Sequence, residues 1–428
     1  MKILFNILLL FSVIYCTNST SNIWEKININ LPPSSVQNFG AHKSCLINQK
    51  IYIFGGAQEN RTLGIDFGDN PFIKYYGNLL SYDIKKDKWT ILVNENSTVS
   101  KPYPRAFFGM DCSEKLGKLW IFGGLFPGPQ FPLPSEDFWE YNIATNEFTE
   151  IPKSDIIGEW PPERSANILK YFENYNKKYL IVYGGASLFF SQLNDTWIYS
   201  FQTNKWCQII PTIKMGGNIN TLSTVYKNKL YIYSGEREAF PGSGLQGTWR
   251  WAPEVFAFNF KQRTWSLIFN NSNENQIINR AYSGAASVNN YFLIFSGDYG
   301  IWRNTQTIFN STCSLIANGV DYLVPEVVYF DLDEEKWHPN YLPEYQTPVS
   351  PFKISKADPL NIEPIDGRLT VNDPNSNAPP ALKRTDMVCN KRHCFISGGW
   401  GGIGSGLPTT NQFYNNYIWK LKPLKYLP

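Results

Sequence analysis

A short run of alternating apolar residues that ends in glycine recurs six times along the chain. Each run is apolar on both faces and rich in β-branched and aromatic residues, which is typical of a strand packed on two sides. The terminal glycine suits a tight bend where backbone from a neighbouring layer approaches closely. Four copies end in Gly-Gly and two in Ser-Gly; they span 51–56, 119–124, 180–185, 230–235, 292–297 and 394–399.

A second pattern follows the first five copies: two aromatic residues lie seven positions apart, with a short polar turn between them. A constant interval across such a turn predicts a hairpin whose two aromatics keep one register. A further strand precedes each glycine copy, so each repeat is predicted to hold four antiparallel strands, A to D. The aromatic pairs are Tyr82 and Trp89, Tyr141 and Phe148, Tyr199 and Trp206, Phe258 and Trp265, and Phe330 and Trp337.

The repeat resembles the kelch repeat from about Trp24 to the end of the chain. The resemblance implies an all-β fold, a six-bladed kelch-type β-propeller, and it leaves function open because kelch propellers include binding modules and enzymes. Arginines that open strand A are expected to make internal hydrogen bonds rather than ligand contacts; they are Arg105, Arg164, Arg280 and Arg384.

The chain ends predict how the ring closes. Residues 23–27 reproduce the pattern of the fourth strand, whereas the last repeat supplies only strands A, B and C, the third near 417–419. The N-terminal strand is therefore expected to complete the sixth blade and remove its open edge. Two alternatives stay open. Tyr426 lies seven residues after Trp419, so the C-terminus could instead supply its own short fourth strand. The Pro-rich segment 343–382, which we interpret as an insertion, is long enough for a degenerate seventh blade.

The first residues place one Lys before an apolar run that is shorter than a membrane-spanning helix requires, which indicates a secretory signal peptide. We expect cleavage after Cys16 or Ser19, a signal at 1–19, one propeller domain at 20–428, and a secreted or extracellular protein without stable membrane insertion. Aromatic residues make up 16% of the chain and charged residues 18%, which excludes a disordered chain. A net charge of +3 gives no electrostatic case for a nucleic-acid partner or anionic lipid.

Six cysteines follow the signal, an even number that permits disulfides without requiring them. Cys389 and Cys394 can close a hairpin if their side chains share a face. In a secreted chain, exposed Asn-x-Ser/Thr sites accept glycans. Such sites occur at Asn18, Asn60, Asn96, Asn194, Asn270 and Asn310.

In a four-stranded up-and-down blade, the A–B and C–D turns share one face of the ring, here called the turn face. The B–C and D–A connections share the opposite face, here called the loop face. The long segments of this chain are B–C and D–A connections, so the loop face is the expected binding surface. Its aromatic and charged residues suit a sugar ring or a protein hot spot. The ligand-binding candidates are Glu236, Arg237, Trp249, Arg250, Trp251, Asp298, Trp302, Arg303 and Trp400.

Catalytic and metal patterns are weak. A copper site like that of galactose oxidase, a kelch-like enzyme, needs converging imidazoles, but the strand scheme scatters the three histidines, His42, His338 and His393, over the ring. Two Gly-x-Gly-x-x-Gly strings, at 242–247 and 399–404, lack the following helix that a phosphate site requires. No cofactor, metal or catalytic residue is therefore assigned.

We interpret the chain as a binding module for an extracellular protein or glycan. The alternative hypothesis is a metal-independent carbohydrate-active enzyme, such as a mutarotase or lyase, in which Glu236, Glu238 or Asp298 acts beside Arg237 or Arg303. Carboxylates and an Arg that converge at the channel mouth would favour the enzyme, and an exposed aromatic patch would favour binding.

Overall fold

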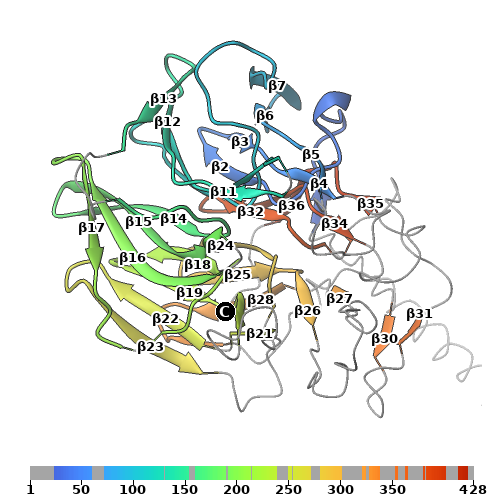
Figure 1. Ribbon diagram of the computed structural model, residues 1–428. Helices are drawn as coiled ribbons and strands as arrows, with labels where there is room; N and C mark the ends of the chain where they lie inside the picture. Colours follow the sequence, from blue (N-terminus) through green and yellow to red (C-terminus); the bar gives the residue numbers. More distant parts are fainter. Residues whose placement is uncertain are drawn as a thin grey trace, which may run out of the picture.

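A ring of antiparallel sheets forms the protein (Figure 1), as seen in a computed structural model. The chain contains a short 3-10 turn, η1 (Ser34–Val36), and within the described residues no helix has the length and hydropathy of a transmembrane segment. The structure describes residues 24–59, 72–129, 131–153, 160–188, 191–213, 215–238, 249–252, 254–270, 280–300, 321–323, 327–337, 352–354, 362–364, 379–380, 382–401 and 413–422.

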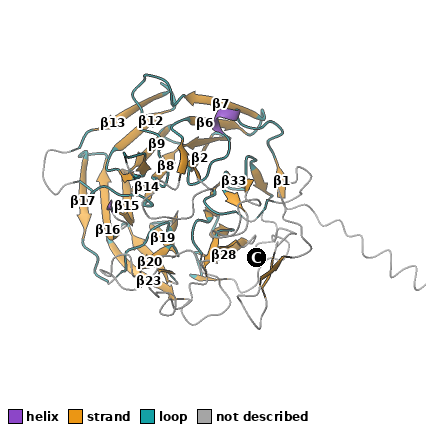
Figure 2. Ribbon diagram, turned by 45° about the vertical axis from the view of Figure 1, so that its right-hand side comes forward, coloured by secondary structure: helices purple, strands orange, loops and turns teal. Residues whose placement is uncertain are grey.

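Six four-stranded sheets are the blades, and each follows the order A, B, C, D from the centre outward (Figure 2). Blade 1 holds β2 (Lys43–Ile47), β3 (Lys50–Phe54), β6 (Leu79–Asp83) and β7 (Lys88–Val93). Blade 2 holds β8 (Gly109–Ser113), β9 (Lys118–Phe122), β12 (Phe138–Asn142) and β13 (Glu147–Ile151). Blade 3 holds β14 (Ile168–Asn174), β15 (Lys177–Ala186), β16 (Gln192–Ser200) and β17 (Lys205–Ile209).

The remaining blades follow the same order. Blade 4 holds β18 (Leu222–Tyr226), β19 (Lys229–Tyr233), β22 (Glu254–Asn259) and β23 (Thr264–Asn270). Blade 5 holds β24 (Gly284–Val288), β25 (Tyr291–Phe295), β28 (Val327–Asp331) and β29 (Lys336–Trp337). Blade 6 holds β32 (Asp386–Cys389), β33 (Cys394–Ser397), β36 (Trp419–Leu421) and β1 (Trp24–Lys26).

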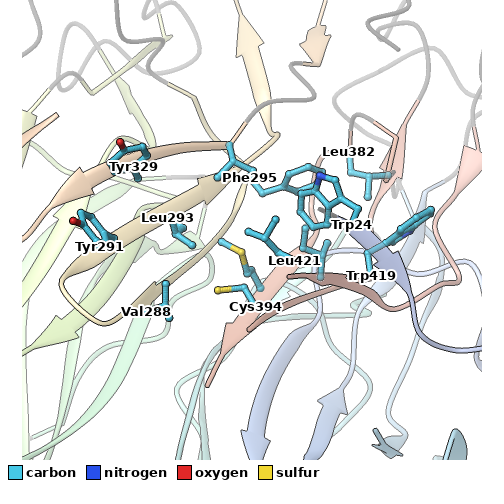
Figure 3. Packing of buried hydrophobic residues seen from close by; sticks show 13 residues of the cluster. Trp24, Val288, Tyr291, Leu293, Phe295, Tyr329, Leu382, Cys394, Trp419 and Leu421 are labelled. Carbon is cyan, nitrogen blue, oxygen red and sulfur yellow. The ribbon is translucent and has the colours of Figure 1, made fainter. Parts of the chain in front are cut away.

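The six-bladed prediction is confirmed, and so is closure by the N-terminal strand. β1 pairs antiparallel with β36, with Trp24 opposite Leu421. Trp24 is buried between blades 5 and 6, where its ring meets Phe295 edge-on at 5.3 Å and lies in one cluster with Trp419 and Leu382 (Figure 3). Tyr426 lies outside the described residues. From 343–382 the structure describes, as strands, a two-stranded hairpin of β30 (Phe352–Ile354) and β31 (Ile362–Pro364).

The aromatic interval sets the C–D register as predicted. All five pairs lie directly opposite each other in their hairpins, with ring centroids 4.9 to 5.2 Å apart. In blades 1 to 3 the tyrosine hydroxyl also contacts a side chain five residues later, as in the pair Tyr199 and Asn204 at 3.2 Å. That later residue has a left-handed φ in each of these three turns, so the hydrogen bond anchors the tight turn.

The glycine phrases are explained by contacts between blades. A Cβ on Gly55 would lie 2.6 Å from the carbonyl oxygen of Arg105, in the next blade. The N–H of Gly56 donates to that same carbonyl at 2.8 Å, and Gly124, Gly185, Gly297 and Gly399 make the equivalent bond to the blade that follows. In the two Ser-Gly copies a serine takes the first position with a left-handed φ. The Ser296 hydroxyl there accepts a hydrogen bond from Leu382 N–H at 2.7 Å.

Candidate functional site

The loop face is built from short hairpins that continue strands B and C beyond the glycines. In blade 3 one long pair, β15 and β16, makes this extension as a continuation of the same strands, with a register shift between Tyr183 and Gly185. The first residue after the glycine pair also bridges to the D–A segment, as between Gly40 and Ala57, which places B–C and D–A connections on one face. The other extensions are β4 (Ala57–Glu59) with β5 (Phe72–Tyr75), β10 (Leu125–Phe126) with β11 (Leu133–Pro134), β20 (Glu236–Glu238) with β21 (Trp249–Trp251), β26 (Asp298–Gly300) with β27 (Asp321–Leu323), and β34 (Trp400–Gly401) with β35 (Phe413–Tyr414).

A ring of backbone hydrogen bonds surrounds the centre of this face. One residue per blade, two positions before strand A, has a left-handed φ between 54° and 58°. Five of the six links of this ring are hydrogen bonds from the N–H of one such residue to the carbonyl of the same residue in a neighbouring blade, 2.5 to 3.1 Å long. A left-handed φ is unfavourable for non-glycine residues, so the ring is a strained feature fixed by the whole assembly. The ring residues are Ala41, Phe107, Ala166, Asn220, Tyr282 and Arg384.

The side chains of three residues from this ring of backbone hydrogen bonds, Phe107, Tyr282 and Arg384, meet near the propeller axis. Phe107 of blade 2 and Tyr282 of blade 5 come from opposite sides of the propeller, and their ring centroids are 6.5 Å apart. The Arg384 guanidinium lies 5.0 Å from the Phe107 ring, 5.1 Å from Tyr282 and 4.6 Å from buried Trp400. All three ring residues are half-buried. We call Phe107, Tyr282, Arg384 and Trp400 the mouth cluster.

The position of Arg384 corrects the sequence alignment of the strand-A arginines. Leu382, not Arg384, occupies the place of Arg105, because its carbonyl accepts the hydrogen bond from the second glycine of the preceding blade. Arg384 therefore lies two residues further along, in the left-handed ring. The assignment of Arg384 to the strand-A arginine position was wrong by two residues, and its guanidinium stacks on aromatic rings at the centre of the loop face.

The other strand-A arginines are buried within their blades. Arg105 binds both carboxylate oxygens of Asp137, at 2.5 and 2.6 Å, and the carbonyl of Gly123 at 2.9 Å. Arg164 repeats the arrangement with Asp195 in blade 3. Burial by itself would raise the pKa of Asp137, but the hydrogen bonds and charge of Arg105 hold it below its usual value. Arg280 is also buried and donates to the carbonyl of Ser296.

Behind the mouth cluster, strand A of all six blades lines a central channel of about 290 Å³. Neighbouring inner strands are joined there by polar and covalent contacts. A disulfide links Cys45 of blade 1 to Cys112 of blade 2, and Asp386 of blade 6 accepts hydrogen bonds from the N–H and hydroxyl of Ser44. Burial raises the pKa of Asp111, although Lys170 lies 3.9 Å away.

The predicted ligand-binding residues fall into three groups. Trp400 joins the mouth cluster, and Glu236 is half-buried with its backbone paired to Ile219. The backbone of five further candidates lies in the hairpin extensions: Arg237, Trp249, Arg250, Trp251 and Asp298. In the pairing of β20 with β21, Arg237 lies opposite Arg250 and Glu236 opposite Trp251. Trp302 and Arg303 lie outside the described residues.

An aromatic patch that the sequence analysis did not single out lies on blade 2. Tyr103 is 72% exposed and stacks on Phe126 with ring centroids 6.3 Å apart. Phe131, 38% exposed, follows β10 in the same B–C connection. In the sequence this patch is visible only as Phe126 and Phe131 on either side of a short proline-containing stretch, and their spacing matches no recognisable motif.

The histidines and cysteines are placed as follows. His42 is buried, and its Nε2 lies 2.9 Å from the Ser397 hydroxyl. His393 lies in the A–B turn of blade 6, on the turn face, and His338 lies outside the described residues. Cys389 and Cys394 form a disulfide across that same turn. Within the described residues, one group of three potential metal-binding side chains lies close together: Cys45, Asp111 and Cys112. The two cysteine sulfurs of this group form a disulfide with each other, so they are not available as thiolate ligands.

Three predicted glycan acceptors, Asn96, Asn194 and Asn270, are exposed in the structure. Asn18, Asn60 and Asn310 lie outside the described residues.

The fold, its six repeats and its glycine phrases define a kelch-type β-propeller. A family model described as "KLHDC2/KLHL20/DRC7 Kelch-repeats domain" matches residues 9–235 and 117–350, which together span most of the chain. The chain therefore belongs to the kelch-repeat family. Kelch propellers commonly serve as protein-binding modules.

Proposed function

We propose that the chain is a secreted, glycosylated binding module that holds an extracellular protein or glycan on its loop face, with the mouth cluster at the centre. The observation that carries the proposal is the half-buried residue Arg384, whose guanidinium is stacked among Phe107, Tyr282 and Trp400 with Nε and Nη1 buried. Arginine and large aromatics gathered at the centre of a surface are the residues that dominate binding energy at interfaces.

The hairpin extensions support the same location. They surround the mouth cluster on all six blades, as rigid scaffolds commonly do for binding loops. The Tyr103 and Phe126 stack adds an apolar surface on the same face, of the kind that packs against sugar rings or protein side chains.

The test starts from arrays of extracellular proteins and of glycans, probed with the purified full chain. Each ligand found is then titrated against Arg384→Gln and against Tyr175→Ala, a control on the turn face that removes an exposed aromatic. We expect Arg384→Gln to weaken binding at least tenfold, as hot-spot residues do, and Tyr175→Ala to change it less than about twofold. Equal affinity of Arg384→Gln and wild type for every ligand would overturn the location.

Secretion and glycosylation have a separate test. The full chain is expressed in eukaryotic cells, and the mature protein is sequenced from its N-terminus. We expect it in the medium, beginning after Cys16 or Ser19, and losing mass on enzymatic removal of N-glycans. Retention inside the cell with an intact N-terminus would contradict this part of the proposal and leave the binding face untouched.

A further inference from the structure

The turn face carries more positive charge than the chain as a whole. The turn face consists of the A–B turns of six blades and the C–D turns of blades 1 to 5. Counted with the strand residue on each side, these turns hold fifteen Lys or Arg against eight Asp or Glu, a net charge of +7. The whole chain carries only +3, so the remainder carries −4.

Much of the positive charge on blades 2 to 5 is paired. Lys227 and Lys229 of blade 4 contact Asp333 and Glu335 of blade 5, at 2.5 and 2.7 Å. Lys115 contacts Glu173 at 3.2 Å. These pairs neutralise much of the charge of blades 4 and 5. Exposed cations without a salt bridge among the described residues then remain in two places: Lys177, Lys261 and Arg263 on blades 3 and 4, and a larger group on blades 6 and 1.

Six exposed cations on blades 6 and 1 remain, and we call them the basic arc: Lys50, Lys85, Lys86, Lys88, Lys391 and Arg392. Within the described residues none of them has an ion-pair partner. The two blades are adjacent, since Lys43 and Asp386 join their inner strands at 3.2 Å. The turns of blade 1 are joined by a hydrogen bond from Ile84 N–H to the Gln49 carbonyl at 3.0 Å.

The turns that carry the basic arc are held in shape by their own contacts. The Cys389–Cys394 disulfide closes the turn that bears Lys391 and Arg392, and the Asn390 side chain accepts hydrogen bonds from the N–H groups of Arg392 and His393 at 2.8 Å. In blade 1 the Asp83 carboxylate accepts the N–H groups of Lys85 and Lys86, so this acid caps the turn. A polyanion would meet cations on ordered turns and lose little entropy in fixing them.

The composition of the basic arc distinguishes among anionic partners. No exposed large apolar side chain among the described residues belongs to its three turns, although Ile29 reaches its edge through a backbone bond to Asp87. Peripheral membrane binding uses inserted apolar side chains, single-stranded nucleic acid uses stacking aromatics, and a folded acidic protein uses aromatic anchors. A sulfated polysaccharide needs mainly cations, and an arginine holds its sulfate oxygens in two parallel hydrogen bonds.

We propose that the basic arc is a second binding surface, for a linear sulfated polysaccharide, independent of the loop face.

Binding of the full chain to a heparin fragment of defined length tests the proposal, over a range of salt concentrations. We expect affinity to fall steeply with salt, because binding of a polyanion releases counterions. The variant Lys391→Gln with Arg392→Gln should lose about tenfold in affinity and show a smaller salt slope. The control, Lys74→Gln with Lys153→Gln, removes the same charge from the loop face and should stay within about twofold of wild type, because these lysines lie on the opposite face and are already paired with Glu95 and Glu136.

Thermal unfolding of both variants verifies that they fold. Equal loss of heparin affinity in the two double variants would overturn the proposal, because only net charge would then matter. Tighter binding to single-stranded DNA, or to vesicles containing phosphatidylserine, than to heparin would overturn the assigned partner. Since none of these residues belongs to the mouth cluster, loop-face ligands should bind the basic-arc variant normally.

Discussion

At the residue scale, the buried pair of Arg105 and Asp137 shows how a charge is used to hold loop-face backbone in place. The arginine side chain is 1% exposed and the aspartate 19%. The guanidinium also holds the carbonyls of Tyr103 and Gly123, so one side chain joins the D–A segment, the glycine bend and the start of strand C. Removing one partner of such a pair leaves a buried charge without compensation.

We therefore expect Asp137→Asn to lower the free energy of unfolding by about 3 kcal/mol. The control is Lys153→Gln, which breaks the exposed pair with Glu136 in the same blade and should cost less than about 1 kcal/mol. Urea denaturation at neutral pH measures both. Similar midpoints for the two variants would show that the buried pair contributes no more than a surface one.

His42 gives a pH prediction at the same scale. Burial lowers its pKa to about 4, and the nearby Asp386 charge offsets only part of this effect. The unfolded chain binds the proton near pH 6.5, so the stability is full above that pH and falls as the pH drops toward 4. Between pH 6.5 and pH 4, we expect the free energy of unfolding of wild type to fall by on the order of 2 to 3 kcal/mol more than that of His42→Asn. Asparagine is chosen because Asn167 occupies the equivalent position in blade 3. Parallel pH profiles of unfolding free energy would contradict the assignment.

At the element scale, what the sequence could predict depended on how local the pattern was. The C–D hairpins were predictable because Tyr82 and Trp89 lie close in sequence and repeat at one interval. The hairpin extensions were not, because no recurring pattern follows the glycine phrases. Arg384 was misaligned because its blade carries Leu382 where blades 2 and 3 carry Arg105 and Arg164, and the interblade hydrogen bond to that carbonyl fixes the register.

Closure by β1 is the element-scale prediction. Trp24 is 3% exposed and contacts residues of two blades, so Trp24→Ala should lower the free energy of unfolding by about 3 to 5 kcal/mol. Ile29→Ala, a few residues further along and 89% exposed, is the control and should change stability by less than about 0.5 kcal/mol. Thermal and urea unfolding compare them. A small effect of Trp24→Ala would mean that the ring does not depend on its N-terminal strand.

At the scale of the whole molecule, net charge was a poor guide because it sums a positive turn face with a negatively charged remainder of the chain. The sequence provides the +3, but only the arrangement of turns separates +7 on one face from −4 elsewhere. The mouth cluster has the same origin: Phe107 and Tyr282 are distant in sequence and meet only because blades 2 and 5 face each other across the axis. Features that depend on ring closure cannot be found from one repeat.

The two disulfides differ in the length of chain that they close, and their contributions to stability should differ accordingly. Cys45–Cys112 joins two blades and closes a loop of 67 residues, whereas Cys389–Cys394 closes one of 5. In the chain-entropy account, a disulfide stabilises by restricting the unfolded chain, so the longer loop contributes about 4 kcal/mol and the shorter about 2. We expect the double alanine variant of Cys45 and Cys112 to lose about twice as much stability as that of Cys389 and Cys394, by urea unfolding under non-reducing conditions. In the presence of reductant, both variants should have the same free energy of unfolding as wild type. Equal losses of stability in the two variants without reductant would contradict the prediction, because loop length would then not set the contribution of each disulfide.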